Sequence, residues 1–265
     1  MTTDDLAARW RTDLEAWAIP DEILAQALAS PWIHPVAMFT VTGEVPDSPS
    51  HRRAREAVPP GGSVLDVGSG GGRASMALVP PARRLVAVDQ SPAMLEAFRV
   101  AATERGVDAS TVLGQWPQVA DEVEAADVVV CHHVAYNVQD IVPFLRALDV
   151  HARRRVVLEL PTRHPLSWMN PLWERFWGVR RPTQPSADDL RDLAAAAGFD
   201  ARIEHWTHEA WRAQIDQSTD ELVANTRIRL CLADDRDGEV AAALRELPEP
   251  DAREVATVWW DVARG

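Results

Sequence analysis

Short, almost purely apolar runs alternate with helical stretches from residue 63 onward. Strands with so little polar alternation are typical of a parallel sheet that is covered by helices on both faces. The segments between the runs suit right-handed crossovers between parallel strands. The pattern therefore predicts a doubly wound α/β domain. The predicted strands are Ser63–Val67, Arg84–Asp89, Thr111–Leu113, Asp127–Cys131 and Arg155–Leu160, with two later candidates at Ala201–Trp206 and Glu254–Trp260.

The first sixty residues show a helical pattern of apolar positions rather than strand-like runs. Apolar residues recur at helical spacing from Leu6 to Trp17, and Pro20 ends this pattern. We expect residues 1–58 to form a helical N-terminal cap and residues 59–265 to form the α/β domain. Two insertions are expected within that domain, a lid at residues 161–185 and a helical insertion at residues 207–252.

The charge of the chain narrows the range of partners. With 27 basic and 40 acidic residues, the formal net charge is −13. An acidic surface repels phosphate backbones, so nucleic acid is not expected as a partner. No run approaches the roughly 18 apolar residues of a membrane span, and the N-terminal residues lack the basic start of a signal peptide. We therefore expect a cytoplasmic protein with a small-molecule partner and no membrane association.

The chain contains no lysine, because all 27 of its basic residues are arginine. Chemistry that needs a lysine amine is thereby excluded. This removes Schiff-base aldolases, pyridoxal-phosphate enzymes and lysine-dependent phosphoryl transfer from consideration.

A glycine-rich loop follows the first predicted strand. Gly68, Gly70 and Gly72 lie between that strand and a short predicted helix, where glycines let a ligand lie directly on the backbone. A dinucleotide fingerprint would need a glycine at position 73, which is Arg73. A tight structural turn is the alternative interpretation. Asp89 ends the second predicted strand, where a carboxylate can accept hydrogen bonds from both ribose hydroxyls.

The segments Leu65–Gly72 and Val86–Leu95 resemble, in order and spacing, the motifs of class I S-adenosylmethionine-dependent methyltransferases. The resemblance covers about residues 60–206. It implies a Rossmann-like fold with a mostly parallel seven-stranded sheet, S-adenosyl-L-methionine as the cofactor, and methyl transfer as the activity.

The resemblance also assigns cofactor contacts by position. The methionine part falls to Asp66, Gly68, Ser69 and Gly70, the ribose to Asp89, and the surroundings of the adenine to Gln90 and Met94. Gln115 and Trp116 follow the third strand, where the family contacts the adenine, and the backbone around Cys131 and His132 would meet the amino group of the cofactor. For Trp116, packing in the core is an equally good interpretation.

The acceptor side of the site is less defined by the sequence. His133, Tyr136 and His164 are candidates for a general base, although each could instead be a packing or capping residue. Trp32, Arg163, Trp168 and Trp173 are candidate substrate contacts, because an aromatic segment of this length must pack or line a pocket. No metal site is expected, because neighbouring histidines at a strand end point opposite ways and no carboxylate cluster accompanies them.

These observations predict an enzyme that transfers a methyl group to an O, N or C atom of a small, apolar or aromatic acceptor. Two alternatives share the glycine loop. An NAD(P)-dependent oxidoreductase is disfavoured by Arg73 and by the absence of lysine. A non-catalytic cofactor-binding protein would keep the loop and lack an acceptor pocket.

Overall fold

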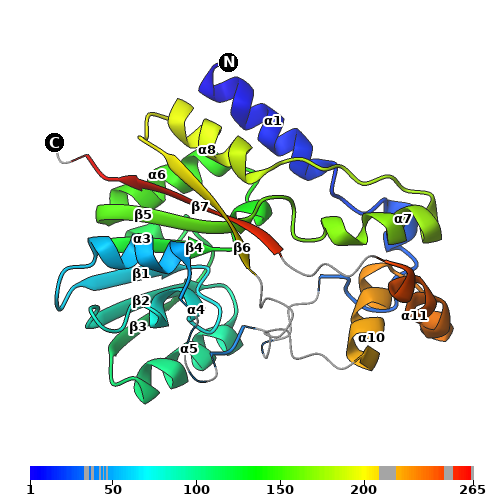
Figure 1. Cartoon of the computed structure of the whole chain (residues 1–265), viewed down its shortest axis with the longest axis horizontal. Coiled ribbons are helices and arrows are strands. Elements are labelled where there is room, and N and C mark those ends of the chain that lie inside the picture. The colour runs from blue at the N-terminus through cyan, green and yellow to red at the C-terminus, as the bar shows by residue number, and fades with distance from the viewer. Residues whose placement is uncertain are drawn as a thin grey trace.

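The computed structural model describes residues 1–32, 36, 39–41, 43, 45, 47–208, 219–247 and 253–263. At its centre is a seven-stranded sheet with the strand order β3-β2-β1-β4-β5-β7-β6 (Figure 1). The strands are β1 Ser63–Val67, β2 Arg84–Asp89, β3 Asp108–Leu113, β4 Ala126–His132, β5 Ala152–Pro161, β6 Arg202–His208 and β7 Arg253–Asp261.

The sheet is mostly parallel, as the sequence predicts. β7 is the exception, because it pairs antiparallel with both β5 and β6. All seven predicted strands are present, and most are longer than the apolar runs that predicted them. β5 begins at Ala152 rather than at Arg155, because Ala152 pairs with Ala126 of β4.

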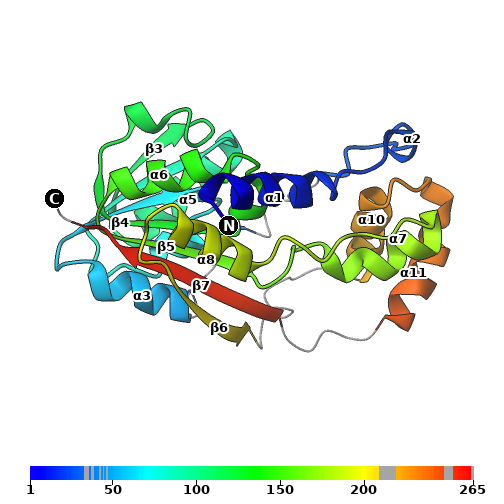
Figure 2. The same cartoon turned by 90° about the horizontal axis from the view of Figure 1, so that it is seen from above.

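Helices cover both faces of the sheet. Trp10 and Leu14 of α1 pack with residues of α6 and α8 on one face, and residues of α3, α4 and α5 pack on the other. Figure 2 shows α1 and α6 on the opposite side of the sheet from α3. These helices are α1 Thr3–Glu15, α3 Pro49–Ala57, α4 Arg73–Met76, α5 Pro92–Glu104, α6 Ile141–His151 and α8 Ala187–Ala196.

Local sequence explains where several of these helices begin. Thr2 and Ser186 each form a capping box with an aspartate three residues later, Asp5 and Asp189. Each box satisfies backbone N–H groups that the first helical turn leaves without a partner. None of the helices in the described part of the chain is long and apolar enough to cross a membrane.

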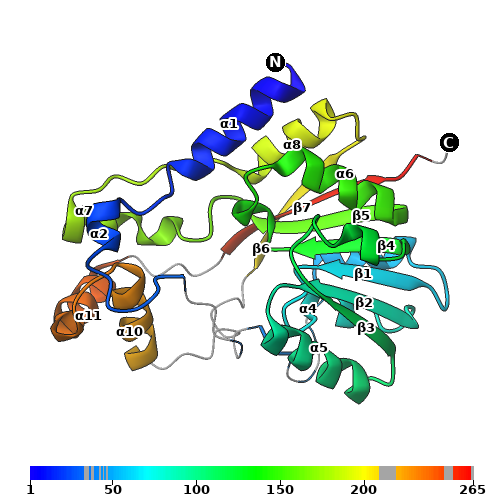
Figure 3. The same ribbon diagram turned by 180° about the vertical axis from the view of Figure 1, so that it is seen from behind.

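A second hydrophobic core lies beyond the sheet. It brings together Ile19 and Ile23 near α2 (Asp21–Leu24), Leu172 and Trp173 of α7 (Asn170–Trp177), and residues of α10 (Thr219–Arg229) and α11 (Asp237–Glu246). We call this group of helices the cap. Figures 1 and 3 show α7, α10 and α11 together, past the end of the sheet where β5 finishes.

The first 58 residues, predicted as one helical cap, are distributed over three places. α1 covers one face of the sheet, α3 covers the other, and only the short stretch around α2 joins the cap. The reason is that each helix presents a separate apolar stripe, and these stripes are buried against different partners.

Candidate functional site

The glycine loop lies at the carboxyl edge of the sheet, between β1 and α4. Gly68 and Gly70 have positive φ angles of 69° and 50°, which a residue with a side chain adopts rarely. A Cβ atom on Gly68 would lie 2.3 Å from Cγ2 of Val134, which follows β4. The loop is therefore pressed against the segment that leaves the neighbouring strand, and only glycine fits there.

Residues near the N-terminus cover part of this loop. A Cβ atom built on Gly71 would lie 2.5 Å from the carbonyl oxygen of Phe39, and one built on Gly70 would lie 3.4 Å from Cβ of Phe39. These contacts place Phe39 at the glycine loop. Much of the surrounding stretch, including residues 33–35, 37 and 38, lies outside the described residues.

Asp89 ends β2 next to this loop. Its carboxylate accepts hydrogen bonds from the backbone N–H of Gly70 and from that of Ser91, both at 2.9 Å. These bonds fix the carboxylate at the sheet edge. The N-cap of α5 is Ser91 and not Asp89. A carboxylate offers about four acceptor positions, so two remain for ligand hydroxyls.

Asp66 in β1 is buried below the loop. Its Oδ2 atom accepts a hydrogen bond of 2.6 Å from the hydroxyl of Ser75 in α4. Its Oδ1 atom is buried without a hydrogen-bond partner among the residues described. Burial raises the pKa of Asp66 to about 7. This hydrogen bond thus joins α4 to β1 on either side of the glycine loop, and Oδ1 of Asp66 remains available to accept a hydrogen bond.

The other predicted cofactor contacts are divided between the edge and the interior. Gln90 and Gln115 are exposed after β2 and β3, whereas Ser69, Met94, Cys131 and His132 are buried or nearly so. The ring of Trp116 is buried and meets His151 edge-on, with a centroid distance of 4.9 Å. This position favours the core interpretation of Trp116 over stacking on an adenine.

A histidine–glutamate pair lies at the same edge, where β4 and β5 end. Nε2 of His133 is 3.1 Å from Oε1 of Glu159, and the backbone N–H of His133 donates to the carbonyl of Glu159 at 2.6 Å. His133 has a φ angle of 62°, a strained value for a residue other than glycine. Its side chain remains 44 % exposed while Glu159 is buried.

The electrostatics of this pair separate the two neighbouring histidines. Burial alone would raise the pKa of Glu159, but the surrounding histidines, including the hydrogen bond from His133, outweigh it and hold this pKa below its ordinary range. Burial lowers the pKa of His132 to about 3, which keeps its ring neutral. His133 is therefore the histidine that can meet a ligand, and the sequence alone did not identify Glu159 as its partner.

Tyr136 and His164 lie farther along the same edge. Tyr136 donates a hydrogen bond of 2.8 Å from its hydroxyl to the carbonyl of Pro161, and burial raises its pKa. His164 stacks on Trp17 with a centroid distance of 3.8 Å, and burial lowers its pKa to about 3. Neither group is suited to accept a proton near neutral pH. Arg253, at the start of β7, interacts electrostatically with both Glu159 and Tyr136.

Tyr136 and His164 also line a cavity of about 330 Å³, which we call the aromatic cavity. Trp32 and Trp173, two of the predicted substrate contacts, line it as well. The other two do not. Arg163 is exposed and forms a β-bridge with Ser186, and Trp168 packs against the core of the cap. Arg181 of the aromatic cavity is a residue that sequence reasoning missed.

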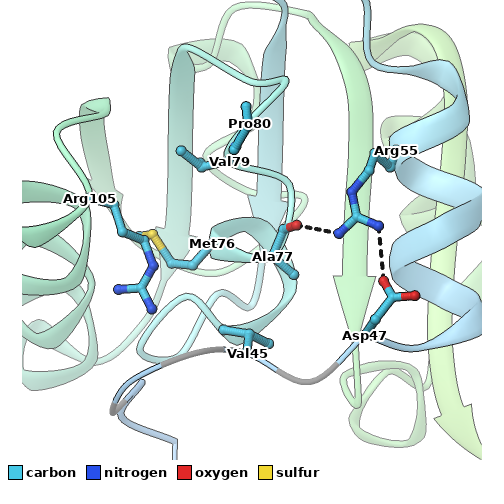
Figure 4. Close-up of a pocket in the computed structure, with 8 residues that line it drawn as sticks. All are labelled: Val45, Asp47, Arg55, Met76, Ala77, Val79, Pro80 and Arg105. Atoms are coloured by element: carbon cyan, nitrogen blue, oxygen red, sulfur yellow. Dashed lines mark hydrogen bonds and ion pairs between the residues drawn. The ribbon is translucent and has the colours of Figure 1, made fainter.

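A larger cavity, of about 500 Å³, lies between α3, α4 and the end of α5 (Figure 4). The charged side chains that line it form ion pairs or hydrogen bonds with other parts of the protein. Arg55 pairs with Asp47 and donates to the carbonyl of Ala77, and Arg105 donates to the carbonyl of Gly43. None of the predicted site residues lines this cavity, so we place the functional site at the sheet edge instead.

Comparison with known proteins agrees with this geometry. Residues 64–153, which run from β1 into β5, match the family model described as a methyltransferase domain. No curated protein matches the chain in sequence. The part of the chain from β1 into β5 is therefore a methyltransferase domain, and the strand order and the glycine loop agree with this assignment.

Solved structures share the fold at low sequence identity. YjhP from Escherichia coli is 17% identical, with a TM-score of 0.56, and the match covers 86% of this chain and 98% of YjhP. YcgJ from Bacillus subtilis is 16% identical, with a TM-score of 0.53, and the match covers 82% and 99%. Coclaurine N-methyltransferase, bound to N-methylheliamine and S-adenosylhomocysteine, is 15% identical, with a TM-score of 0.51, and the match covers 98% and 95%.

Proposed function

We propose that the protein transfers a methyl group from S-adenosyl-L-methionine to an O, N or C atom of a small aromatic acceptor, with His133 as the general base. The observation that carries this proposal is the exposed His133 ring on the buried, ionised Glu159, beside the glycine loop. Coclaurine N-methyltransferase has this fold and was solved with N-methylheliamine. The net charge of −13 favours a small molecule over nucleic acid.

The residues at the sheet edge fit the cofactor. Asp89 has acceptor positions left for ribose hydroxyls, and the backbone at Gly68 and Gly70 is bare of side chains. Asp66 and Ser69 border the loop where the methionine part would lie, and Gln90 and Gln115 lie exposed where the adenine would lie. When bound, S-adenosylmethionine supplies a methyl group on a positively charged sulfur.

His133 and Glu159 supply the proton chemistry in this proposal. Because Glu159 accepts from Nε2–H of His133, the Nδ1 atom of the ring is the one that takes up a proton from the acceptor. The carboxylate then stabilises the imidazolium that forms and holds the ring in place. Phe39 at the glycine loop and the aromatic side chains of the cap would exclude water and orient the acceptor, which accounts for much of catalysis in such reactions.

Replacing Asp89 with alanine tests the cofactor site. We expect the affinity for S-adenosylhomocysteine to fall by about 1.5–3 kcal/mol, the size of hydrogen bonds to a charged group. Isothermal titration calorimetry measures this loss. Asp108→Ala is the matched control, because Asp108 is exposed at the opposite end of the neighbouring strand β3. If Asp89→Ala bound with the affinity of the unaltered protein, Asp89 would not contact the ribose.

Chelation tests the expectation that no metal takes part. The described residues contain no group of three or more histidine, cysteine or acidic side chains placed to hold a metal ion. We expect methyl transfer to proceed unchanged in EDTA, because the proposed chemistry needs only the His133–Glu159 pair. A rate that collapsed in EDTA and returned with one divalent cation would make a metal part of the site.

A further inference from the structure

The aromatic cavity is bounded by parts of the chain that are far apart in sequence. Its walls include Trp17 after α1, Trp32 after α2, Tyr136 after β4, His164 after β5 and Trp173 of α7, and Arg181 closes one side. A volume of about 330 Å³ is near the lower end for small-molecule sites, so a ligand of one or two rings fits. Aromatic walls of this kind favour a flat, apolar body.

Arg181 is held rigidly in this cavity. Its Nη1 atom donates hydrogen bonds to the carbonyls of Trp17 at 2.5 Å and of Ala18 at 2.9 Å. Its guanidinium lies over the ring of Trp173, 4.2 Å from the centroid. Because both hydrogens of Nη1 are used by the two carbonyls, Nη2 is the amino group of the guanidinium that remains for a ligand. Nε is buried and has no hydrogen-bond partner among the residues described.

The charge of Arg181 is not balanced by a neighbour. Among the described residues, no carboxylate lies within 4.0 Å of its guanidinium, and burial lowers its pKa. The preceding residue, Arg180, is a typical surface arginine by comparison. Its side chain is 87% exposed and forms an ion pair of 3.1 Å with Glu174. An arginine that is partly buried without a counter-charge is costly, and an anionic ligand would repay this cost.

The remaining titratable groups of the cavity do not supply an anion inside it. Arg229 is the second arginine of the lining, and His164 is neutral because burial lowers its pKa. Glu15 also lines the cavity, but it is exposed to solvent. The interior therefore carries positive charge within aromatic walls.

From these observations we infer that the aromatic cavity binds an aromatic carboxylate, with the guanidinium of Arg181 as the group that receives the carboxylate. This inference rests on the proposed function in one respect, because it identifies the bound aromatic carboxylate as the class of methyl acceptor. The ring system lies against Trp173 and Tyr136, and the carboxylate anchors it.

A pair of matched ligands tests the inference on the unaltered protein. Naphthoate and its uncharged amide, naphthamide, have the same rings and nearly the same shape. Titration followed by tryptophan fluorescence or calorimetry is expected to give at least about tenfold tighter binding of naphthoate, the effect of a charge-assisted hydrogen bond. Equal affinities, or no binding of naphthoate, would overturn the inference.

Two variants assign the preference to Arg181. Arg181→Met keeps an apolar chain over Trp173 and removes the charge, so the preference for naphthoate over naphthamide is expected to vanish. Arg180→Met is the control and is expected to keep the preference. Survival of the full preference in Arg181→Met would overturn the inference. If that variant does not fold, the comparison of the two ligands on the unaltered protein still decides.

Two further measurements separate this inference from the proposed function. If S-adenosylhomocysteine binds and naphthoate does not, the anion site is wrong and the methyltransferase proposal stands. If naphthoate binds through Arg181 and S-adenosylhomocysteine does not, the cofactor proposal fails while the anion site stands. Tighter binding of naphthylmethylamine, a cation, than of naphthoate would overturn the inference in favour of selection by Glu15.

Discussion

Replacing His133 with alanine is expected to lower kcat by about two to four orders of magnitude, the usual contribution of a general base. The affinity for S-adenosylhomocysteine is expected to stay unchanged, because the side chain acts on the acceptor. The measurement is the rate of S-adenosylhomocysteine release with a phenolic acceptor such as a hydroxynaphthoate. A phenol needs the base, since its proton must leave as the new bond forms.

His205→Ala provides a closely matched control. His205 is 43% exposed and its Nε2 lies 3.4 Å from Asp188, whereas His133 is 44% exposed and lies 3.1 Å from Glu159. His205 lies within β6 and away from the glycine loop, so its loss is expected to leave kcat unchanged. Equal rates in the His133→Ala variant and the unaltered protein would show that the acceptor transfers no proton to His133.

The largest expected effect on stability comes from Trp10. This side chain is 2% exposed in the core between α1 and the sheet, and its Nε1–H donates to the carbonyl of Val138 at 2.8 Å. Trp10→Ala is expected to lower the free energy of unfolding by about 3–5 kcal/mol, since it leaves both a cavity and an unpaired carbonyl. Urea denaturation measures the loss.

Trp32→Ala serves as the control for this substitution. Trp32 is 55% exposed, so its removal is expected to change the free energy of unfolding by no more than about 0.5 kcal/mol. A loss of similar size in both variants would mean that Trp10 contributes no more than a surface tryptophan. In that event α1 would not be an integral part of the sheet core.

The sequence predicted the strands because their signal is local. The apolar runs of β1, β2, β4 and β5 mark strands that are covered on both faces. Strand ends were predicted less well. Asp108 and Ala152 begin β3 and β5 because they pair with Arg84 and Ala126 of neighbouring strands, and pairing of this kind leaves no mark on hydrophobicity.

The candidate site was predicted only where a motif marks it. The glycine loop and Asp89 are recognisable from their spacing, and the structure places them together. Glu159 lies inside an apolar run and gains its role only through the fold, which brings it to His133. Arg181 is likewise one of 27 arginines until Trp17 and Trp173 surround it. Such roles arise from contacts between distant residues.

The roles of the aromatic residues were also only partly predictable from the sequence. The sequence allowed Trp168 and Trp173 either to pack in a core or to line a pocket. Trp173 does both, because it is buried in the cap and one side of it faces the aromatic cavity. Trp168 packs only against the cap. Helical spacing cannot distinguish these outcomes, because it does not specify what the buried stripe of a helix meets.

The place of β7 between β5 and β6 has a consequence for the order of folding. In the described part of the chain β6 pairs only with β7, and residues 209–252 separate the two strands. The ends of that long segment must meet before the antiparallel ladder between β6 and β7 can form, which costs chain entropy and slows folding. α10 and α11 pack together within the same segment and thereby shorten its effective length. Early assembly of α10 with α11 would bring β7 to its position between β5 and β6 sooner. Substitutions in the α10–α11 contact should therefore slow refolding, even though they lie outside the sheet.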